Sequence, residues 1–484
     1  MSTAIVVGSG PNGLAAAARL ARAGLDVTVF EASTMIGGGA RSSEMIVPGL
    51  IHDHCSAFHP LPTVSPIFVE LGLAANGPIT WLQPEVDCAH PLDDGSAGLL
   101  YHSLDRTADV MGDDGARWRR VFGRPSARFE ALFADVSQPV LRIPQHPLTL
   151  ARFGVVAALP ATAVARMFKS AQAQALWTGV AAHAFTRLDR PMTSAVGMML
   201  VAAAHASGWV VAEGGSGAIV DALVADIERH GGKFETGMHI KSVADLPPSD
   251  VLMLDVSPSL AADILGDRLP ARVARAYRRF HHGPGAFKVD FAIEGDVPWT
   301  AAGAFGAGTV HLGGSAEEVV ANELAIHCGA MPDRPFVLVG QQYLADPTRS
   351  VGDVHPLWTY AHVPHGYTGD ATEAIVAQIE RFAPGFRNQI LGTSVRSTTE
   401  MSVSNPNYIG GDIIGGASTL KQLLFRPRVT TDPYFTGVPG TYLCSASTPP
   451  GAGVHGMCGA NAAARALAQL AAPRRSPQTT HYQP

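Results

Sequence analysis

The residues from Gly8 to Glu31 have the spacing of a site that binds a dinucleotide. The apolar run 4–7 leads into Gly8-Ser9-Gly10-Pro11-Asn12-Gly13, and a helix-forming stretch follows it to Gly24. In this pattern the first glycine allows a tight turn, the second lets the backbone approach a pyrophosphate, and the third lets the helix pack on the strand. Free amides at the helix N-terminus favour the anion. Glu31 follows the next strand at the spacing expected of a carboxylate that binds a ribose.

The segment after Glu31 distinguishes between cofactors. An NAD domain would continue with further strand and helix repeats, whereas here residues 32–36 lead into Gly37-Gly38-Gly39-Ala40-Arg41. Glycines permit the backbone to approach a large ligand closely, and an arginine can pair with phosphate oxygens. This segment predicts FAD bound in an extended form. The alternative is a flexible turn with a surface arginine.

The same glycine pattern recurs at Gly451-Ala452-Gly453-Val454-His455-Gly456. Too little chain remains before Pro484 for a complete βαβ unit with its ribose acid, so this match is not a second fingerprint. We therefore do not expect a tightly bound NADPH. The sequence does not identify the electron acceptor, for which oxygen, a quinone or another carrier are the alternatives.

His455 and Asp412 are the candidates for catalytic roles. His455 stands at the predicted start of the last helix, where its imidazole could bond the cofactor, carry a proton or cap the turn. Asp412 lies in a glycine-rich turn, where it could act as a base, orient the substrate or have a structural role. Lys288 is a weaker candidate because the register of its strand is unknown. No serine or cysteine has a recognisable nucleophile motif around it.

A histidine-rich loop, His52-x-His54-Cys55-x3-His59, invites a metal interpretation because imidazole and thiolate are zinc ligands. The spacing is not a standard ligand pattern, and the loop directly follows the predicted FAD segment. No metal site is therefore predicted, and the loop is expected to face the flavin or the substrate. A covalent bond from Cys55 or one of these histidines to the flavin is left open.

The elements that must position these residues fall into separated segments. Patterns typical of a nucleotide-binding unit appear at the N-terminus and again after Gly208, whereas residues 116–206 are mainly helical and residues 286–363 are rich in strands. A chain of 484 residues is too long for one ordinary core. The predicted FAD-binding segments are 1–66, 208–275 and 429–472, with a helical lobe at 67–207, a substrate-domain sheet at 276–428 and a disordered tail at 473–484.

Composition narrows the function classes further. The 35 basic and 41 acidic residues give a net charge of −6 without a basic block, so nucleic acid is not a predicted partner. Five scattered cysteines argue against a disulfide framework and favour a cytoplasmic location. No signal-like N-terminus and no apolar run of roughly 18 residues occurs in the sequence. Apolar stretches at 153–168 and 195–206 leave peripheral membrane contact open, although core-facing helices are their ordinary interpretation.

Residues 6–41, 208–223 and 449–461 together resemble the phytoene dehydrogenase-like branch of the FAD-dependent amine oxidase superfamily. The resemblance extends over nearly the whole chain. It includes Phe287-Lys288-Val289-Asp290, Asn405-Pro406-Asn407-Tyr408-Ile409-Gly410-Gly411-Asp412 and the glycine-rich segment that ends at Gly456. It implies an α/β fold with a discontinuous, glutathione-reductase-type, Rossmann-like FAD-binding domain. An α+β substrate domain that contains a helical lobe would be inserted into it.

The resemblance also implies which residues bind FAD. Residues 8–13 would face the pyrophosphate, Glu31 the ribose, residues 38–41 the phosphate and ribityl region, Ile240 the adenine and residues 453–457 the isoalloxazine. Helix-end amides would stabilise the negative charge of a reduced flavin. One extra residue separates Gly38-Gly39 from Arg41, and Cys55 stands at a usual glycine position. The predicted cofactor-binding residues are Gly8, Ser9, Gly10, Pro11, Asn12, Gly13, Glu31, Ala32, Gly38, Gly39, Arg41, Ile240, Gly453, Val454, His455, Gly456 and Met457.

The function predicted from these features is hydride transfer between FAD and an apolar substrate such as a polyene or a lipid. The apolar helical lobe, residues 116–206, motivates the hydrophobic substrate. One alternative is an amine oxidase that uses oxygen, with a cage built from aromatic residues such as Tyr408, Tyr434 or Tyr442. A second alternative is a non-catalytic binding protein of the same fold, resembling GDP-dissociation inhibitors. The intact fingerprint argues against that alternative.

Overall fold

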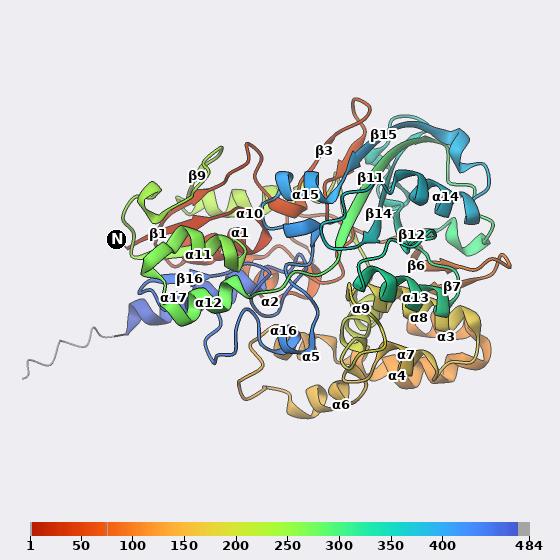
Figure 1. Ribbon diagram of the computed structural model, residues 1–484, viewed down its shortest axis with the longest axis horizontal. Coiled ribbons are helices and arrows are strands. Elements are labelled where there is room, and N and C mark those ends of the chain that lie inside the picture. The colour runs from red at the N-terminus through yellow and green to blue at the C-terminus, as the bar shows by residue number, and fades with distance from the viewer. Residues whose placement is uncertain (1, 75, 473–484) are drawn as a thin grey trace, which may run out of the picture.

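A parallel sheet forms the base of the nucleotide-binding part of the molecule. The computed structural model describes residues 2–74 and 76–472, so the predicted tail 473–484 lies outside the described residues. Within that range the sheet has the strand order β16-β10-β1-β2-β9, and all its pairs are parallel. Segments far apart in sequence therefore meet in one layer (Figure 1). The strands are β1 (Thr3–Val7), β2 (Asp26–Phe30), β9 (Lys233–Glu235), β10 (Val251–Leu254) and β16 (Thr441–Leu443).

Helices cover both faces of this sheet, because side chains alternate between the faces of a strand. Ala4 and Val6 of β1 pack against α1 (Pro11–Arg22), α10 (Gly217–Arg229) and α17 (Met457–Ala471). Ile5 and Val7 pack on the other side against α11 (Pro258–Leu265) and α12 (Ala271–Arg278). This layered arrangement confirms the predicted α/β fold class.

A mixed sheet of seven strands forms the second layer system within the described residues, in the order β15-β11-β14-β13-β12-β6-β7. All its pairs are antiparallel except β12 with β6. One face packs on α14 (Thr372–Phe382), and the other on α8 (Ala171–Ala182) and α13 (Ala316–His327). The strands are β6 (Val86–Pro91), β7 (Ala97–Leu100), β11 (Gly285–Glu294), β12 (Ala307–Leu312), β13 (Val337–Gly340), β14 (Val354–Val363) and β15 (Ile390–Arg396).

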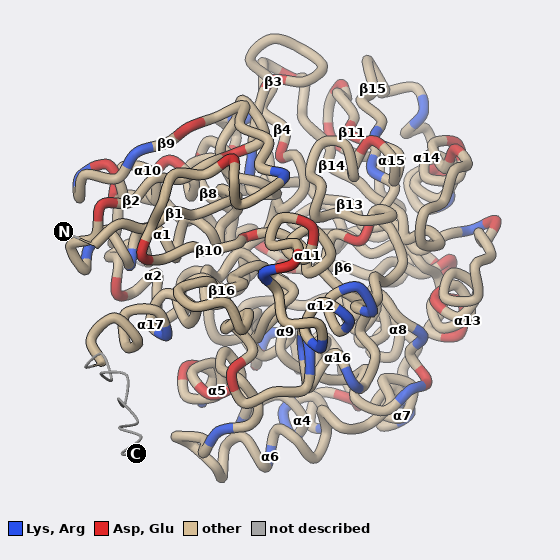
Figure 2. Tube along the Cα trace, turned by 60° about the vertical axis from the view of Figure 1, so that its left-hand side comes forward, with Lys and Arg blue, Asp and Glu red and all other residues tan. Residues whose placement is uncertain are grey.

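A group of helices lies beneath the second sheet and shares its core (Figure 1). Trp118 and Trp177 are fully buried there. The helices are α3 (Leu104–Val110), α4 (Gly115–Ala127), α5 (Phe129–Val136), α6 (Pro147–Ala157), α7 (Ala161–Ala165), α8 and α9 (Ser194–Ser207). The positions of charged residues of both signs are scattered along the chain trace (Figure 2). None of the helices in the described ranges is long and apolar enough to span a membrane.

Short elements connect these layers. They are β3 (Ser42–Glu44), β4 (Ile51–Asp53), β5 (Trp81–Leu82), β8 (Val211–Ala212), α2 (Pro66–Leu71), α15 (Thr398–Ser404) and α16 (Leu420–Leu424). The last helix was expected to start at about His455, but α17 begins at Met457, because Gly456 has a left-handed φ of 66° that an α-helix cannot continue through. Gly459 of α17 lies so close to α1 that an added Cβ would stand 1.7 Å from the carbonyl oxygen of Asn12.

Candidate functional site

Two adjoining cavities open at the carboxyl ends of the parallel strands, the usual place for ligands in open α/β sheets. We call the cavity of about 530 Å³ that Gly8, Glu31 and Ile240 line the fingerprint cavity. The second, of about 310 Å³, is the central cavity, which extends between the second sheet and the helical lobe. Both cavities are lined by Gly10, Asp255, Asn405 and Asn407. The two cavities therefore form one elongated site.

The glycines of the fingerprint create room that a side chain would fill. Gly8 has a φ of 97°, and a Cβ there would lie 2.7 Å from the carbonyl oxygen of Asp255. A Cβ on Gly10 would lie 2.7 Å from Oδ2 of Asp255, and one on Gly13 would lie 2.2 Å from the carbonyl oxygen of Gly8. Pro11 is the first residue of α1, where its missing N–H is not needed. The tight turn and the close packing of helix on strand thus have the predicted physical causes.

Glu31 lies directly after β2 and is held in one orientation. Its Oε2 accepts hydrogen bonds from the backbone N–H of Ser9 at 2.9 Å and from the Ser9 hydroxyl at 2.5 Å. Its Oε1 accepts one from the backbone N–H of Ser33 at 2.8 Å. The carboxylate lines the fingerprint cavity, where it could also accept from a ribose hydroxyl.

Arg41 also lines the fingerprint cavity, although the protein already uses its donors. Its Nε donates to the carbonyl oxygen of Gly38 at 2.7 Å, and its other nitrogens donate to the Ser33 hydroxyl and the Ser404 carbonyl, both at 3.0 Å. Burial lowers the pKa of Arg41. The additional residue before Arg41 is accommodated because Gly38–Ala40 form a 3₁₀ turn whose Ala40 is buried. Arg41 is therefore a cation fixed at the edge of the cavity.

The predicted cofactor residues divide among the two cavities and the helix packing behind them. Those on the fingerprint cavity are Gly8, Ser9, Gly10, Glu31, Ala32, Gly38, Arg41 and Ile240. Those on the central cavity are Gly10, Pro11, Asn12, Gly39, Gly453 and Val454. Gly13, His455, Gly456 and Met457 line neither cavity. Their contact with a cofactor stays a prediction.

His455 occupies a capping position. Its Nδ1 accepts a hydrogen bond from the backbone N–H of Met457 at 3.0 Å, at the first turn of α17. Its ring lies 6.2 Å from that of Phe133, centroid to centroid. Burial lowers the pKa of His455 to about 4, so the imidazole is neutral near pH 7. This geometry fits the capping interpretation, and a catalytic role for His455 stays a prediction.

Asp412 is fully buried, and its carboxylate organises the surrounding turn. Oδ2 accepts hydrogen bonds from the backbone N–H groups of Gly416 at 2.8 Å and Gly283 at 3.1 Å, and lies 2.9 Å from Nδ1 of His282. Oδ1 accepts one from the backbone N–H of Ile414 at 2.9 Å. The turn presents residues 413–415 to the central cavity, whereas Asp412 itself does not line it. Its influence on the cavity is through the position of that turn, and a catalytic role stays a prediction.

Replacing Asp412 with asparagine should lower the free energy of unfolding by roughly 1–2 kcal/mol, because an amide nitrogen cannot accept the bonds that a carboxylate oxygen accepts. Urea denaturation of the Asp412→Asn protein would measure the change. The Asp267→Asn variant, altered at an exposed position, is the matched control. Equal stability of the two variants would contradict the structural role of Asp412.

The histidine-rich loop does not gather into one cluster. His54 Nε2 lies 2.7 Å from the Ser43 hydroxyl, and His59 Nε2 lies 2.9 Å from that of Ser216, while His52 is buried elsewhere. Over residues 2–74 and 76–472, no group of three or more potential ligands is placed to hold a metal ion. Cys55 lines the central cavity, as expected of a loop near the cofactor or the substrate.

Lys288 supports the wall of the central cavity from behind. It forms a buried ion pair with Asp290, and its Nζ lies 5.5 Å from the ring centroid of Trp358, which lines the cavity. The Nε1 of Trp358 donates to the carbonyl oxygen of Cys55 at 3.1 Å. Lys288 is not a lining residue itself.

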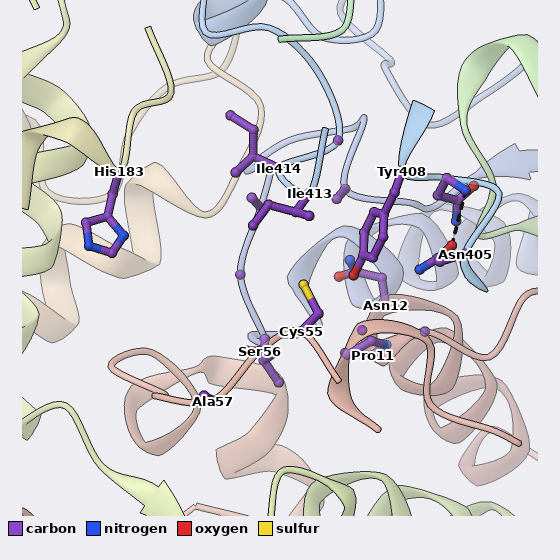
Figure 3. A pocket seen from close by; sticks show the side chains of 18 of the residues that line it. Pro11, Asn12, Cys55, Ser56, Ala57, His183, Asn405, Tyr408, Ile413 and Ile414 are labelled. Carbon is purple, nitrogen blue, oxygen red and sulfur yellow. Dashed lines mark hydrogen bonds between the residues drawn. The ribbon is translucent and has the colours of Figure 1, made fainter. Parts of the chain in front are cut away.

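An aromatic wall of the central cavity was missed from the sequence. Trp358 and Tyr360 point to the same face of β14, with ring centroids 5.0 Å apart at nearly a right angle. Phe58, Trp209 and Tyr408 also line the cavity. The spacing of two residues along β14 was the signal that could have identified the first pair. Figure 3 shows Tyr408 beside Cys55 and Asn12, with His183 on the far side of the cavity.

Two of the tyrosines considered for a cage lie elsewhere. The Tyr434 hydroxyl donates to the carbonyl oxygen of Pro449 at 3.1 Å, and the Tyr442 hydroxyl donates to Gln469 at 2.7 Å. Both side chains belong to the core around the parallel sheet. Tyr408 alone of the three reaches the central cavity.

Asp255 is a second residue that sequence patterns did not identify. It follows β10, and its Oδ2 accepts a hydrogen bond from the backbone N–H of Gly13 at 2.9 Å, inside the first turn of α1. It lines both cavities at their junction. Burial, together with the nearby charge of Glu31, raises the pKa of Asp255 to about 7. An acid that titrates near neutrality therefore stands where an anionic ligand would meet the helix N-terminus.

Known proteins resemble this chain both locally and over its full length. Residues 6–71 match the family model of the NAD(P)-binding Rossmann-like domain. The pyridine nucleotide-disulfide oxidoreductase domain-containing protein 2 of Rattus norvegicus is 24% identical over 95% of this chain and 92% of its own. A hydroxyneurosporene desaturase of Cereibacter sphaeroides is 27% identical over 54% of this chain and 58% of its own. These matches indicate a Rossmann-like nucleotide-binding domain at residues 6–71 and similarity over nearly the whole chain to a protein with an oxidoreductase domain.

A solved structure agrees with this assignment at the level of the fold. A putrescine oxidase bound to putrescine has a TM-score of 0.58 and 16% sequence identity, and the match covers 96% of this chain and 99% of that one. Since the match covers almost the whole of both chains, this chain shares the fold of that oxidase.

Proposed function

We propose that this protein is an FAD-dependent oxidoreductase of the phytoene dehydrogenase-like branch, which transfers a hydride between flavin and an apolar substrate such as a polyene or a lipid. The observation that carries the proposal is the junction of the two cavities at Gly10 and Asp255. The fingerprint cavity has the glycine turn and the carboxylate expected of a dinucleotide site, and the central cavity has a mainly apolar and aromatic lining. The partial similarity to a hydroxyneurosporene desaturase favours the same branch.

The residues present fit FAD. Residues 8–13 would hold its pyrophosphate, because the glycines leave space and the N-terminus of α1 lies beside that space. Glu31 would accept from the ribose, and Gly453 and Val454 would lie beside the ring system. Bound flavin would supply the redox chemistry.

The chain's own contribution is to position the substrate and to exclude water. Trp358 and Tyr360 present flat apolar surfaces, and Ile413 and Ile414 close the cavity from another side. In such surroundings electrostatic interactions are stronger than in water, so the backbone amides near a helix end would stabilise negative charge that develops on a neighbouring ligand.

Anaerobic mixing of the FAD-loaded protein with candidate polyenes and lipids should bleach the flavin absorption. Dithionite added to a second sample is the control, since it shows how large the change is when all the flavin is reduced. Dithionite must reduce the flavin in this control. If no apolar candidate then reduces the oxidised flavin or reoxidises the reduced flavin, the proposed substrate class is wrong.

Oxidation of an amine is a second candidate, favoured by the perpendicular pair Trp358 and Tyr360. Aromatic faces attract cations and can enclose an amine. The putrescine oxidase structure shows that the same fold accommodates such a ligand in that protein. Release of hydrogen peroxide on aerobic addition of simple amines would favour this candidate over the first.

A further inference from the structure

The central cavity contains a polar recess, formed by His183, Thr309 and Trp209. His183 is the C-cap of α8, Thr309 lies on β12 and Trp209 follows α9, and all three line the cavity. His183 lies across the cavity from Tyr408 and Asn12 (Figure 3). Within the described part of the chain, no lysine or arginine lines this cavity. The recess therefore offers hydrogen bonds without a permanent positive charge.

Thr309 contributes a buried hydroxyl that has no partner. Its side chain is 3% exposed, and its Oγ1 makes no hydrogen bond among residues 2–74 and 76–472. Buried polar groups in folded proteins are nearly always paired, so an unpaired one on a cavity wall points to a ligand. The indole Nε1 of Trp209, in contrast, already donates to the carbonyl oxygen of Leu200 at 3.2 Å.

His183 is held by a chain of buried side chains. Its Nε2 lies 3.1 Å from Nε2 of His311 on β12, and Nδ1 of His311 lies 3.5 Å from Sγ of Cys88 on β6. The ring centroid of Trp209 lies 5.9 Å from that of His183. These contacts fix the imidazole and occupy Nε2, so Nδ1 is the ring nitrogen of His183 that is left to meet a ligand.

The imidazole of His183 is neutral under physiological conditions. Burial lowers the pKa of His183 to about 3, and the neighbouring His362 acts in the same direction. A neutral ring cannot balance the charge of a carboxylate, and it offers one donor or one acceptor at Nδ1, depending on the tautomer. A hydroxyl can meet either tautomer, since it both donates and accepts.

We propose that the polar recess binds an uncharged hydroxyl or carbonyl group of an otherwise apolar substrate, through His183 Nδ1 and Thr309 Oγ1. This inference rests on the proposed function and narrows its substrate class. The substrate would be neither a pure hydrocarbon nor a carboxylate, but an apolar molecule with one neutral hydrogen-bonding group. His311 is a positioning residue, because it acts on the substrate only through His183.

Calorimetric titration of the FAD-loaded protein with limonene, perillyl alcohol and perillic acid tests the proposal. The three share one apolar skeleton and differ in having a methyl, a hydroxymethyl or a carboxyl group. Wild-type protein should bind the alcohol about tenfold more tightly than the hydrocarbon, the size expected for one or two net hydrogen bonds, and should not favour the acid. Thr309→Val should lose part of this preference, and His183→Phe should lose nearly all of it.

Two controls separate binding from folding. Thr309→Val replaces an unpaired hydroxyl with a methyl group, so its unfolding temperature should equal or exceed that of wild type while the preference falls. His327→Phe, the same kind of change at the exposed end of α13, should leave the preference intact.

The proposal is overturned if wild type shows no preference for the alcohol, whether both compounds bind equally or neither binds. It is also overturned if Thr309→Val and His183→Phe both keep the full preference. Should the preference be present while no apolar compound of either kind bleaches the flavin, the polar recess stands and the proposed redox function fails.

Discussion

Replacing Gly13 with alanine is expected to abolish FAD binding. The new Cβ would lie 2.2 Å from the carbonyl oxygen of Gly8, in the turn before α1, and 2.9 Å from Oδ2 of Asp255, at the end of β10. Gly8 and Asp255 both line the fingerprint cavity. Relief of this clash requires α1 to move away from β1, which displaces the amides that would hold the pyrophosphate. The bound flavin per chain, measured from the absorption of the purified and reconstituted protein, should fall to near zero.

Gly154→Ala is the matched control, since a Cβ at Gly154 in α6 meets no atom within 4 Å. Alanine in a helix interior is favoured over glycine by roughly 1 kcal/mol, so this variant should be stable and fully loaded. Because Gly13→Ala could also impair folding, Glu31→Gln provides a variant without added bulk. Loss of its charge-assisted bond should weaken FAD binding on the order of tenfold or more. Full loading of Gly13→Ala would contradict the fingerprint assignment.

The affinity for FAD is expected to fall as the pH rises above 7, because Asp255 then becomes negative at the point where a pyrophosphate would meet α1. The decrease should approach tenfold for each pH unit, the limit for one proton. In the Asp255→Asn protein the amide oxygen can still accept from Gly13, but no charge appears. The affinity of this variant for FAD should therefore be nearly independent of pH. At about pH 8–9, where Asp255 is charged in wild type, the variant should bind FAD more tightly than wild type does.

The Asp255→Asn substitution should also change how the stability of the folded protein depends on pH. The pKa of Asp255 in the folded protein, about 7, lies above its ordinary value of 3.8, so the folded state binds more protons than the unfolded state between these values. Stability contributed by this group is thus present at low pH and is lost as the pH rises toward 7. Asp255→Asn should stabilise the protein more at pH 8 than at pH 5.

Fluorescence titration with FAD at pH values from about 6 to about 9 would measure how the affinity for FAD depends on the titration of Asp255. Asp263→Asn is the control, since Asp263 lines the fingerprint cavity but pairs with Arg278 on the surface. It should retain the dependence on pH. A flat profile in wild type, or an unchanged profile in Asp255→Asn, would contradict the role given to Asp255.

The parts of the site that could be predicted from the sequence are those with local spacing. The fingerprint glycines and Glu31 lie within one βαβ unit, whose geometry follows from the residues between them. The fold class followed in the same way, from strand and helix patterns with characteristic periods. Arg41 was less predictable, because the 3₁₀ turn that accommodates Ala40 depends on the burial of that side chain.

The parts that could not be predicted depend on how distant segments meet. Asp255 reaches Gly13 across 242 residues, and no spacing rule connects them. Trp358, Thr309 and His183 converge because β14, β12 and the end of α8 share one side of the second sheet, which only the strand order reveals. For His455, the direction of the ring depends on the left-handed backbone of Gly456, a property that the glycine permits but does not dictate.

The absorption spectrum of the protein after reconstitution with FAD tests the central claim most directly. We expect the bands of oxidised flavin with one FAD bound per chain, and loss of those bands in Gly13→Ala but not in Gly154→Ala. A colourless wild-type protein that takes up no FAD, although circular dichroism shows that it is folded, would mean that the elongated site does not bind FAD.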